Sequence, residues 1–245
     1  MNDIPLNQRL IVALDVETFE QAVSLTDTLK QTTKSFKVGS QLFTACGPRI
    51  VEHLKEQGLK VFLDLKYHDI PNTVARAVAE ATALGADIIN MHAMGGFAMM
   101  EAASCAALET AREKKTGTPL LLSVTVLTSM DEATFREVLG TPGRAVDEQV
   151  LHLARLTAGA GLDGVVASPH EIALLRRELG PDFVILTPGI RPAASDAGDQ
   201  KRFMTPGQAV RLGADYLVVG RPITGAADPE TAASAILTEM ENALS

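Results

Sequence analysis

Eight short apolar runs recur along the chain, and each is followed by a stretch with helical character that is often rich in alanine and leucine. Runs without polar alternation are typical of strands buried on both faces, as in a parallel sheet. The ends of successive runs lie about 29 residues apart on average, which matches the unit length of an eightfold barrel of about 250 residues. The runs cover residues 10–15, 35–40, 60–66, 87–93, 120–128, 163–169, 182–190 and 215–222.

We therefore predict an α/β fold: one (β/α)8 TIM barrel that forms a single domain over residues 1–245. Helices are expected between the runs, for example at 133–139 and 171–179. A doubly wound open sheet is the alternative, because it shows the same alternation of strands and helices. Glycines shortly before several runs mark the places where a helix ends and the chain turns. They are Gly58, Gly85, Gly161, Gly180 and Gly213.

The composition argues against several classes of protein. The 22 basic residues are outnumbered by 30 acidic ones, which disfavours broad nucleic-acid binding. No apolar run approaches the roughly 20 residues of a membrane helix, and residues 1–15 lack the basic and apolar segments of a secretory signal. Cys46 and Cys105 have no neighbours at metal-ligand spacing and are expected to be small core residues in a reducing compartment. We expect a cytoplasmic protein without nucleic-acid or membrane partners.

Charged side chains gather where the predicted strands end. The segment DLKYHDIPNT carries Asp64, Lys66 and Asp69, while Asp15 and Lys37 lie near the ends of the first two runs. In a barrel, the carboxyl ends of all strands face the active site. Burying an ion costs several kcal/mol, so folding alone gives no reason for such an alternating array of carboxylates and amines. We interpret the array as catalytic.

Each of these residues also has a structural interpretation. Asp15 could cap the next helix, and Lys37 could extend to the rim as an ion-pair partner. Asp64 and Lys66 could form a structural salt bridge. A divalent metal held by Asp15, Asp64 and Asp69 is conceivable from the ligand types. It is disfavoured, because the two nearby lysines already neutralise these carboxylates.

The seventh and eighth runs end in similar turns, PGIRP and VGRP. Barrels commonly hold a phosphate between these two loops. Arg191 and Arg221 supply the charge-assisted hydrogen bonds that a phosphate dianion needs. Gly189 and Gly220 let the backbone approach it closely. The two turns together indicate a phosphate site.

Other features are less informative. Neither a Rossmann glycine motif nor a P-loop occurs in the chain. We expect His68 and His92 to be structural residues with hydrogen-bonded side chains. The long polar connections at 128–148 and 191–207 are typical of lids over a barrel site.

With these motifs, the chain resembles the orotidine 5′-phosphate decarboxylase family in its bacterial form. The likeness extends over nearly the whole chain, through VALD, FKVG, FLDLKYHDIPNT, VTVLTSM, GLDGVVAS, TPGIRP, AGDQKR and VVGRPIT. The D-x-K-x-x-D core alone is shared by related barrels, whereas the extended motif together with Lys37 is more specific. The resemblance implies decarboxylation of orotidine 5′-monophosphate to UMP in pyrimidine synthesis, without a cofactor or metal.

The resemblance also implies a role for each matching residue. Lys37, Asp64, Lys66 and Asp69 would form a catalytic tetrad, in which Lys66 stabilises the carbanion and protonates C6. Asp69 and Thr73 would enter the site of the neighbouring subunit, so that the protein is a homodimer with shared sites. The substrate contacts would be Asp15 and Lys37 at the ribose, Thr128 at the pyrimidine, Ile70 and Pro188 at the apolar wall, and Arg191, Gln200, Gly220 and Arg221 at the phosphate.

Two alternatives remain at this stage. A sister barrel of the same superfamily, a metal-dependent sugar-phosphate decarboxylase or aldolase, shares D-x-K-x-x-D but carries an acidic residue where this chain has Lys37. A non-catalytic nucleotide-binding barrel would need the phosphate turns but not Lys66. The intact tetrad favours the orotidine 5′-monophosphate reaction over both.

Overall fold

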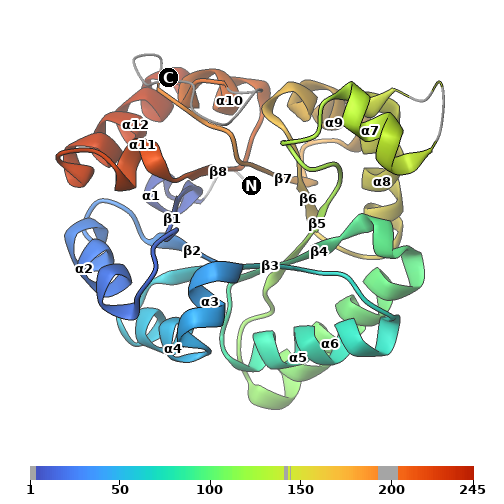
Figure 1. Ribbon diagram of the computed structural model, residues 1–245, viewed down its shortest axis with the longest axis horizontal. Coiled ribbons are helices and arrows are strands. Elements are labelled where there is room, and N and C mark those ends of the chain that lie inside the picture. Colours follow the sequence, from blue (N-terminus) through green and yellow to red (C-terminus); the bar gives the residue numbers. More distant parts are fainter. Residues whose placement is uncertain (1–3, 141–142, 144, 193–203) are drawn as a thin grey trace.

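The strands form a closed parallel barrel (Figure 1). The computed structural model describes residues 4–140, 143, 145–192 and 204–245. Neighbouring strands pair in sequence order, and β8 pairs with β1 to close the sheet. This closure rules out the open doubly wound sheet and confirms the predicted (β/α)8 fold. The strands are β1 Leu10–Ala13, β2 Ser35–Gly39, β3 Lys60–Tyr67, β4 Ile88–His92, β5 Leu120–Val124, β6 Gly164–Val166, β7 Val184–Thr187 and β8 Tyr216–Val219.

Helices surround the barrel (Figure 1). The predicted helical segments 133–139 and 171–179 fall in α7 and α9. Thr18, rather than Asp15, caps the helix after β1: its hydroxyl accepts the Gln21 N–H, and Gln21 Oε1 accepts the Thr18 N–H. The helices are α1 Leu6–Arg9, α2 Phe19–Leu29, α3 Ser40–Cys46, α4 Arg49–Glu56, α5 Pro71–Ala83, α6 Phe97–Lys114, α7 Glu132–Leu139, α8 Val146–Gly159, α9 Ile172–Leu179, α10 Pro206–Leu212, α11 Arg221–Thr224 and α12 Pro229–Leu244, with short 3-10 turns at Ala93–Gly95 and Pro169–Glu171.

Alternation along the strands separates two hydrophobic cores. Ile11 and Ala13 belong to the cluster inside the barrel, whereas Leu10 and Val12 belong to the cluster between strands and helices. Burial on both faces explains why the runs show no polar alternation. The buried residues of the inner cluster are Ile11, Ala13, Phe62, Ile88, Leu122, Val124, Val166, Val184, Leu186, Tyr216 and Val218.

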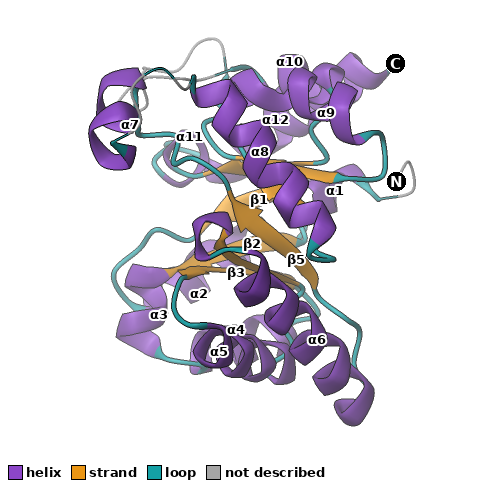
Figure 2. Ribbon diagram, turned by 90° about the vertical axis from the view of Figure 1, so that its right-hand side faces the viewer, coloured by secondary structure: helices purple, strands orange, loops and turns teal. Residues whose placement is uncertain are grey.

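The two ends of the barrel carry different elements. Figure 2 shows α3, α7 and α11, which follow β2, β5 and β8, at one end, and α1 at the opposite end. The connection 128–148 contains α7. In the connection 191–207, positions 193–203 lie outside the described residues. The five glycines predicted to end helices have φ between 71° and 105°, as the prediction requires.

The two cysteines do not both lie in the core, so that expectation is wrong. Cys46 is half-buried and Cys105 is exposed. On α6, Ala103 and Ala107 are buried, and successive helical positions turn by about 100°, which directs Cys105 away from that face. No helix in the described part of the chain is long and apolar enough to cross a membrane.

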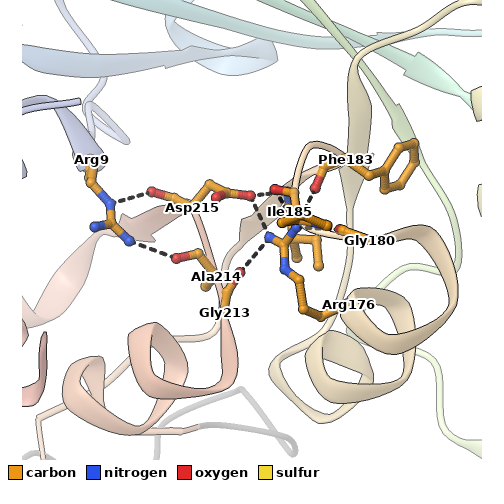
Figure 3. Close-up of polar contacts among 9 residues, drawn as sticks. Arg9, Arg176, Gly180, Phe183, Ile185, Gly213, Ala214 and Asp215 are labelled. Carbon is orange, nitrogen blue, oxygen red and sulfur yellow. Dashed lines mark hydrogen bonds and ion pairs between the residues drawn. The ribbon is translucent and has the colours of Figure 1, made fainter. Parts of the chain in front are cut away.

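An arginine–aspartate network fastens β7 and β8 at their amino ends (Figure 3). Arg176 Nη1 donates to three carbonyls just before β7. Its Nη2 donates to the Gly213 carbonyl at 2.6 Å and to Asp215 Oδ2 at 2.7 Å. Asp215 Oδ2 also accepts the Ile185 N–H, while the Asp215 carbonyl accepts Arg9 Nε. The charged pair is only 20% and 14% exposed. It therefore fixes the two strands whose opposite ends carry the predicted phosphate turns.

We expect Arg176→Met to destabilise the protein by about 3 kcal/mol, because it leaves Asp215 and several carbonyls without their donor. Urea unfolding would measure this loss. Arg177→Met is the matched control: its side chain is 70% exposed, so its effect should stay within about 0.5 kcal/mol. Equal effects of the two substitutions would contradict the structural role of the network.

Candidate active site

The charged array occupies inward-facing positions on adjacent strands. Lys37 pairs with Phe62 in the β2–β3 ladder, and Phe62 points into the barrel. Asp64 lies two residues beyond Phe62, and Asn90 lies two residues beyond the inward Ile88. Since strand side chains alternate with a period of two, all three positions face the interior near the carboxyl end.

The array is held together by ion pairs. Asp64 is 8% exposed; its Oδ2 lies 3.3 Å from Lys37 Nζ and its Oδ1 lies 2.6 Å from Lys66 Nζ. Lys37 Nζ also contacts Asp15 Oδ1 at 3.0 Å. The structure thus joins Asp15, Lys37, Asp64 and Lys66 in one alternating chain of charges, as the sequence predicts. A methyl group at Gly39 would lie 3.0 Å from Lys37 Nζ, so glycine leaves room for this ammonium.

Electrostatics keep Lys37 charged. Burial by itself lowers the pKa of Lys37, but the carboxylates of Asp64 and Asp15 outweigh burial, so the pKa is raised above its ordinary value. A cation held this way serves as a fixed positive charge rather than as a proton donor near neutral pH.

Lys66 lies where the regular pairing of β3 with β4 is interrupted. Leu63 pairs with Ile89 and Tyr67 with Met91, so three residues of β3 lie opposite the single residue Asn90 of β4. Lys66 has φ +51°, a left-handed conformation that costs an L-residue about 1–2 kcal/mol. The Lys66 N–H, displaced from the ladder, donates to Asn90 Oδ1 at 2.8 Å. Strain of this kind is found at functional sites.

Sequence reasoning missed Asn90. Its side chain is fully buried, and besides accepting from Lys66 it donates to Asp64 Oδ1 at 2.7 Å. A signal was present, because asparagine is the one polar residue within the apolar stretch IINM. Buried amides are seldom left without partners, so this position indicated a polar contact inside the barrel.

The segment after Lys66 lies at the surface of the chain. Asp69, Ile70 and Thr73 are all exposed, and Ile70 retains 66% of its surface. Asp69 Oδ1 accepts the Ile70 N–H at 2.6 Å. Within the described residues, Asp69 forms no ion pair with Lys66. The structure of one chain therefore unites three members of the predicted tetrad and leaves the fourth outside.

The two turns predicted to bind phosphate border a pocket of about 210 Å³ that also includes Asp15 and Lys37. Gly189 has φ +79°, a conformation open to glycine, and the Arg191 N–H donates to the Met204 carbonyl. The pocket joins the turns to the charged array. Its lining contains Ala13, Asp15, Lys37, Pro188, Gly189, Ile190, Arg191, Val218, Gly220, Arg221 and Pro222.

Four predicted substrate-binding residues are not placed at this pocket by the described structure: Ile70, Thr73, Thr128 and Gln200. Thr128 is half-buried in the turn after β5, and neither Thr128 nor Ile70 is among the described lining residues. Gln200 lies outside the described residues. Their roles stay predictions.

A larger cavity, of about 590 Å³, lies at the opposite end of the barrel. Its charged residues are already paired: Lys55 and Lys60 contact the two oxygens of Asp87 at 2.6 and 2.9 Å, and Asp87 Oδ2 also accepts the Val61 N–H. The amino end of a barrel typically serves stability. The smaller pocket, with its excess of positive charge, is the better candidate for an anionic substrate.

The two histidines near Lys66 contact each other. The rings of His68 and His92 lie 5.3 Å apart, and neither makes the expected side-chain hydrogen bond within the described part of the chain. Burial lowers the pKa of His92, and His68 and Lys66 lower it further. The fold therefore favours the neutral form of His92.

This lowered pKa predicts a pH dependence of stability. Unfolded histidine takes up a proton near pH 6.5, whereas folded His92 resists protonation until lower pH, so stability is retained above about pH 6.5 and falls below it. His92→Gln should lose less stability than wild type between about pH 8 and pH 5 in urea unfolding. His152→Gln, at an exposed position on α8, should keep the wild-type slope. Identical slopes for wild type and His92→Gln would contradict this.

Known proteins resemble this chain over nearly its whole length. Residues 8–236 match the model of the orotidine 5′-phosphate decarboxylase / HUMPS family. Orotidine 5′-phosphate decarboxylase of Moorella thermoacetica is 52% identical over 95% of this chain and 92% of that protein. The enzyme of that name from Syntrophotalea carbinolica is 51% identical over 98% of both. The crystal structure of orotidine 5′-phosphate decarboxylase from Lactobacillus acidophilus superposes with a TM-score of 0.83 at 38% identity, covering 95% of this chain and 99% of that one. The chain belongs to the orotidine 5′-phosphate decarboxylase / HUMPS family.

Proposed function

We propose that the protein decarboxylates orotidine 5′-monophosphate to UMP and CO2, the last step of UMP synthesis, without a metal or an organic cofactor. The observation that carries this proposal is the Lys37–Asp64–Lys66 array beside a pocket bordered by two arginines. Family membership and the names of the relatives support the same reaction.

The reaction needs a fixed cation at one carbon atom. When the bond between C6 and its carboxyl carbon breaks, CO2 leaves and the electron pair stays on C6 in an orbital in the ring plane, which the π system cannot delocalise. A preorganised ammonium stabilises this charge without reorganisation during the reaction. Lys66 Nζ supplies that charge and then transfers a proton to C6, leaving a neutral amine that solvent reprotonates.

Asp64 and Lys37 hold Lys66 ready for this step. Asp64 contacts both ammonium groups within 3.3 Å, so Lys66 is aimed by a buried partner rather than moving freely. A substrate carboxylate placed next to Asp64 is repelled in the ground state, and the loss of CO2 relieves that repulsion. Lys37 and Asp15 also offer a donor and an acceptor for ribose hydroxyls.

Binding of the distant phosphate lowers the barrier indirectly. Arg191 and Arg221 provide charge-assisted hydrogen bonds, and Gly189 and Gly220 allow close backbone approach. Gln200 and the connection 191–207 would complete the site. Contacts to the phosphate hold the pyrimidine against Lys66, so remote binding energy is used at the reacting carbon.

A second subunit would complete the tetrad. Asp69 and Thr73 are exposed on one chain, beside Ile70 at 66% exposure. Met94, in the 3-10 turn after β4, and Phe97, the first residue of α6, are 45% and 41% exposed. Large apolar side chains exposed after two consecutive strands are candidates for burial by a partner. We infer a homodimer in which Asp69 and Thr73 of each subunit enter the site of the other.

The direct test is turnover of orotidine 5′-monophosphate by EDTA-treated protein, followed by loss of substrate absorbance. Lys66→Ala should lower kcat by at least about 10³-fold, because it removes both the cation and the proton donor. It should leave UMP binding within a few-fold of wild type. Lys60→Ala, at the opposite end of the same strand, is the control and should remain active.

Two results would redirect the assignment. Activity on a sugar phosphate only after Mg²⁺ is restored would indicate the metal-dependent sister reaction. UMP binding without turnover of either substrate by wild type would indicate a nucleotide-binding protein.

Mixing two inactive variants tests the shared site. In a heterodimer of Lys66→Ala and Asp69→Asn, one site carries both substitutions and the other carries neither. Random exchange of subunits should therefore restore about a quarter of wild-type activity. Mixed variants that stay inactive after verified subunit exchange would show that Lys66 and Asp69 act from the same chain.

A further inference from the structure

Asn90 occupies a special position between the strands of the site. It is the only residue of β4 that lies opposite the three β3 residues 64–66, in the interruption between the Leu63–Ile89 and Tyr67–Met91 pairs. Its side chain is fully buried. Regular pairing would have given the Lys66 N–H a carbonyl partner from the neighbouring strand, and the Asn90 amide oxygen replaces that partner at 2.8 Å.

The orientation of the Asn90 amide is fixed by its surroundings. A backbone N–H can only donate, so the amide oxygen must face Lys66 and the NH2 group must face Asp64. That NH2 group donates to Asp64 Oδ1 at 2.7 Å, the same oxygen that contacts Lys66 Nζ at 2.6 Å. Asp64 Oδ2 faces Lys37 Nζ. Both carboxylate oxygens therefore meet donors only.

We propose that Asn90 is a positioning residue for decarboxylation: its amide holds the left-handed backbone of Lys66 and the carboxylate of Asp64 in one rigid unit. The inference rests on the proposed function. Asn90 does not need to touch the substrate, because it acts on both ends of the Lys66–Asp64 pair, through the Lys66 backbone and the Asp64 oxygen. Small misplacement of a preorganised charge is costly for rate, whereas it hardly affects binding through the phosphate.

Asn90→Leu removes both hydrogen bonds and keeps a side chain that branches at Cγ. We expect its kcat to fall at least about 10-fold while KM and the Kd for UMP stay within about threefold, since the phosphate turns lie on other strands. Ser123→Ala is the matched control. Ser123 is fully buried on the adjacent strand β5, but its hydroxyl is bonded to Thr157 of α8, outside the array, and its substitution should leave kcat within about twofold.

Asn90→Asp gives a readout that a purely structural residue would not show. At low pH the introduced side chain is a neutral carboxylic acid, which can donate a hydrogen bond to Asp64 Oδ1 as the amide does. At high pH it ionises, and two carboxylates then face each other across a hydrogen-bond distance. The titratable groups around them are Lys37 on β2, Lys66 on β3 and, further out, Asp15 on β1 and His92 on β4.

The ratio of the Asn90→Asp kcat to the wild-type kcat should therefore fall at least about 10-fold between pH 5 and pH 9. A ratio that is constant over this range would overturn the proposal, as would an Asn90→Leu variant with kcat within twofold of wild type. If Asn90→Leu does not fold, the pH profile of Asn90→Asp decides alone. If the wild-type protein does not decarboxylate orotidine 5′-monophosphate, both the proposed function and this inference are wrong. If the wild type is active but the Asn90 variants behave like Ser123→Ala, only the inference is wrong.

Discussion

The site depends on one buried carboxylate. Asp64 is 8% exposed and contacts Lys37, Lys66 and Asn90, which come from β2, β3 and β4. A buried ion is tolerated only when opposite charges and hydrogen bonds surround it. The barrel provides that surrounding, because adjacent parallel strands bring inward positions of the same level together.

Backbone strain accompanies this arrangement. Two additional residues in β3 break its ladder with β4, and Lys66 adopts a left-handed conformation. The hydrogen bond to Asn90 offsets part of that cost by satisfying an N–H that the ladder no longer serves. Strained backbone next to a fixed ion network is a means of aiming a side chain that a regular strand would point elsewhere.

The amino end of the barrel carries contacts that stabilise the fold, whereas the carboxyl end carries the residues of the candidate site. At the amino end, Arg176 and Asp215 satisfy the carbonyls and N–H groups that begin β7 and β8. At the carboxyl end, the continuations of the same strands present Arg191 and Arg221 to a pocket. Anchoring of β7 and β8 at their amino ends therefore supports the turns that bring Arg191 and Arg221 to the pocket.

The sequence by itself determined the number and order of the strands, because burial on both faces removes polar alternation and the repeat length matches a barrel. It also located the charges at the carboxyl ends of the strands and the two turns that border the pocket. Tertiary structure decided the rest. The meeting of Asp64 and Lys66 takes place across a bulge and not along a regular strand, and only the partner strand reveals the role of Asn90. The exposure of Cys105 was not predicted for a similar reason. Whether a side chain is buried depends on what packs against its helix or strand, and the local sequence does not encode that.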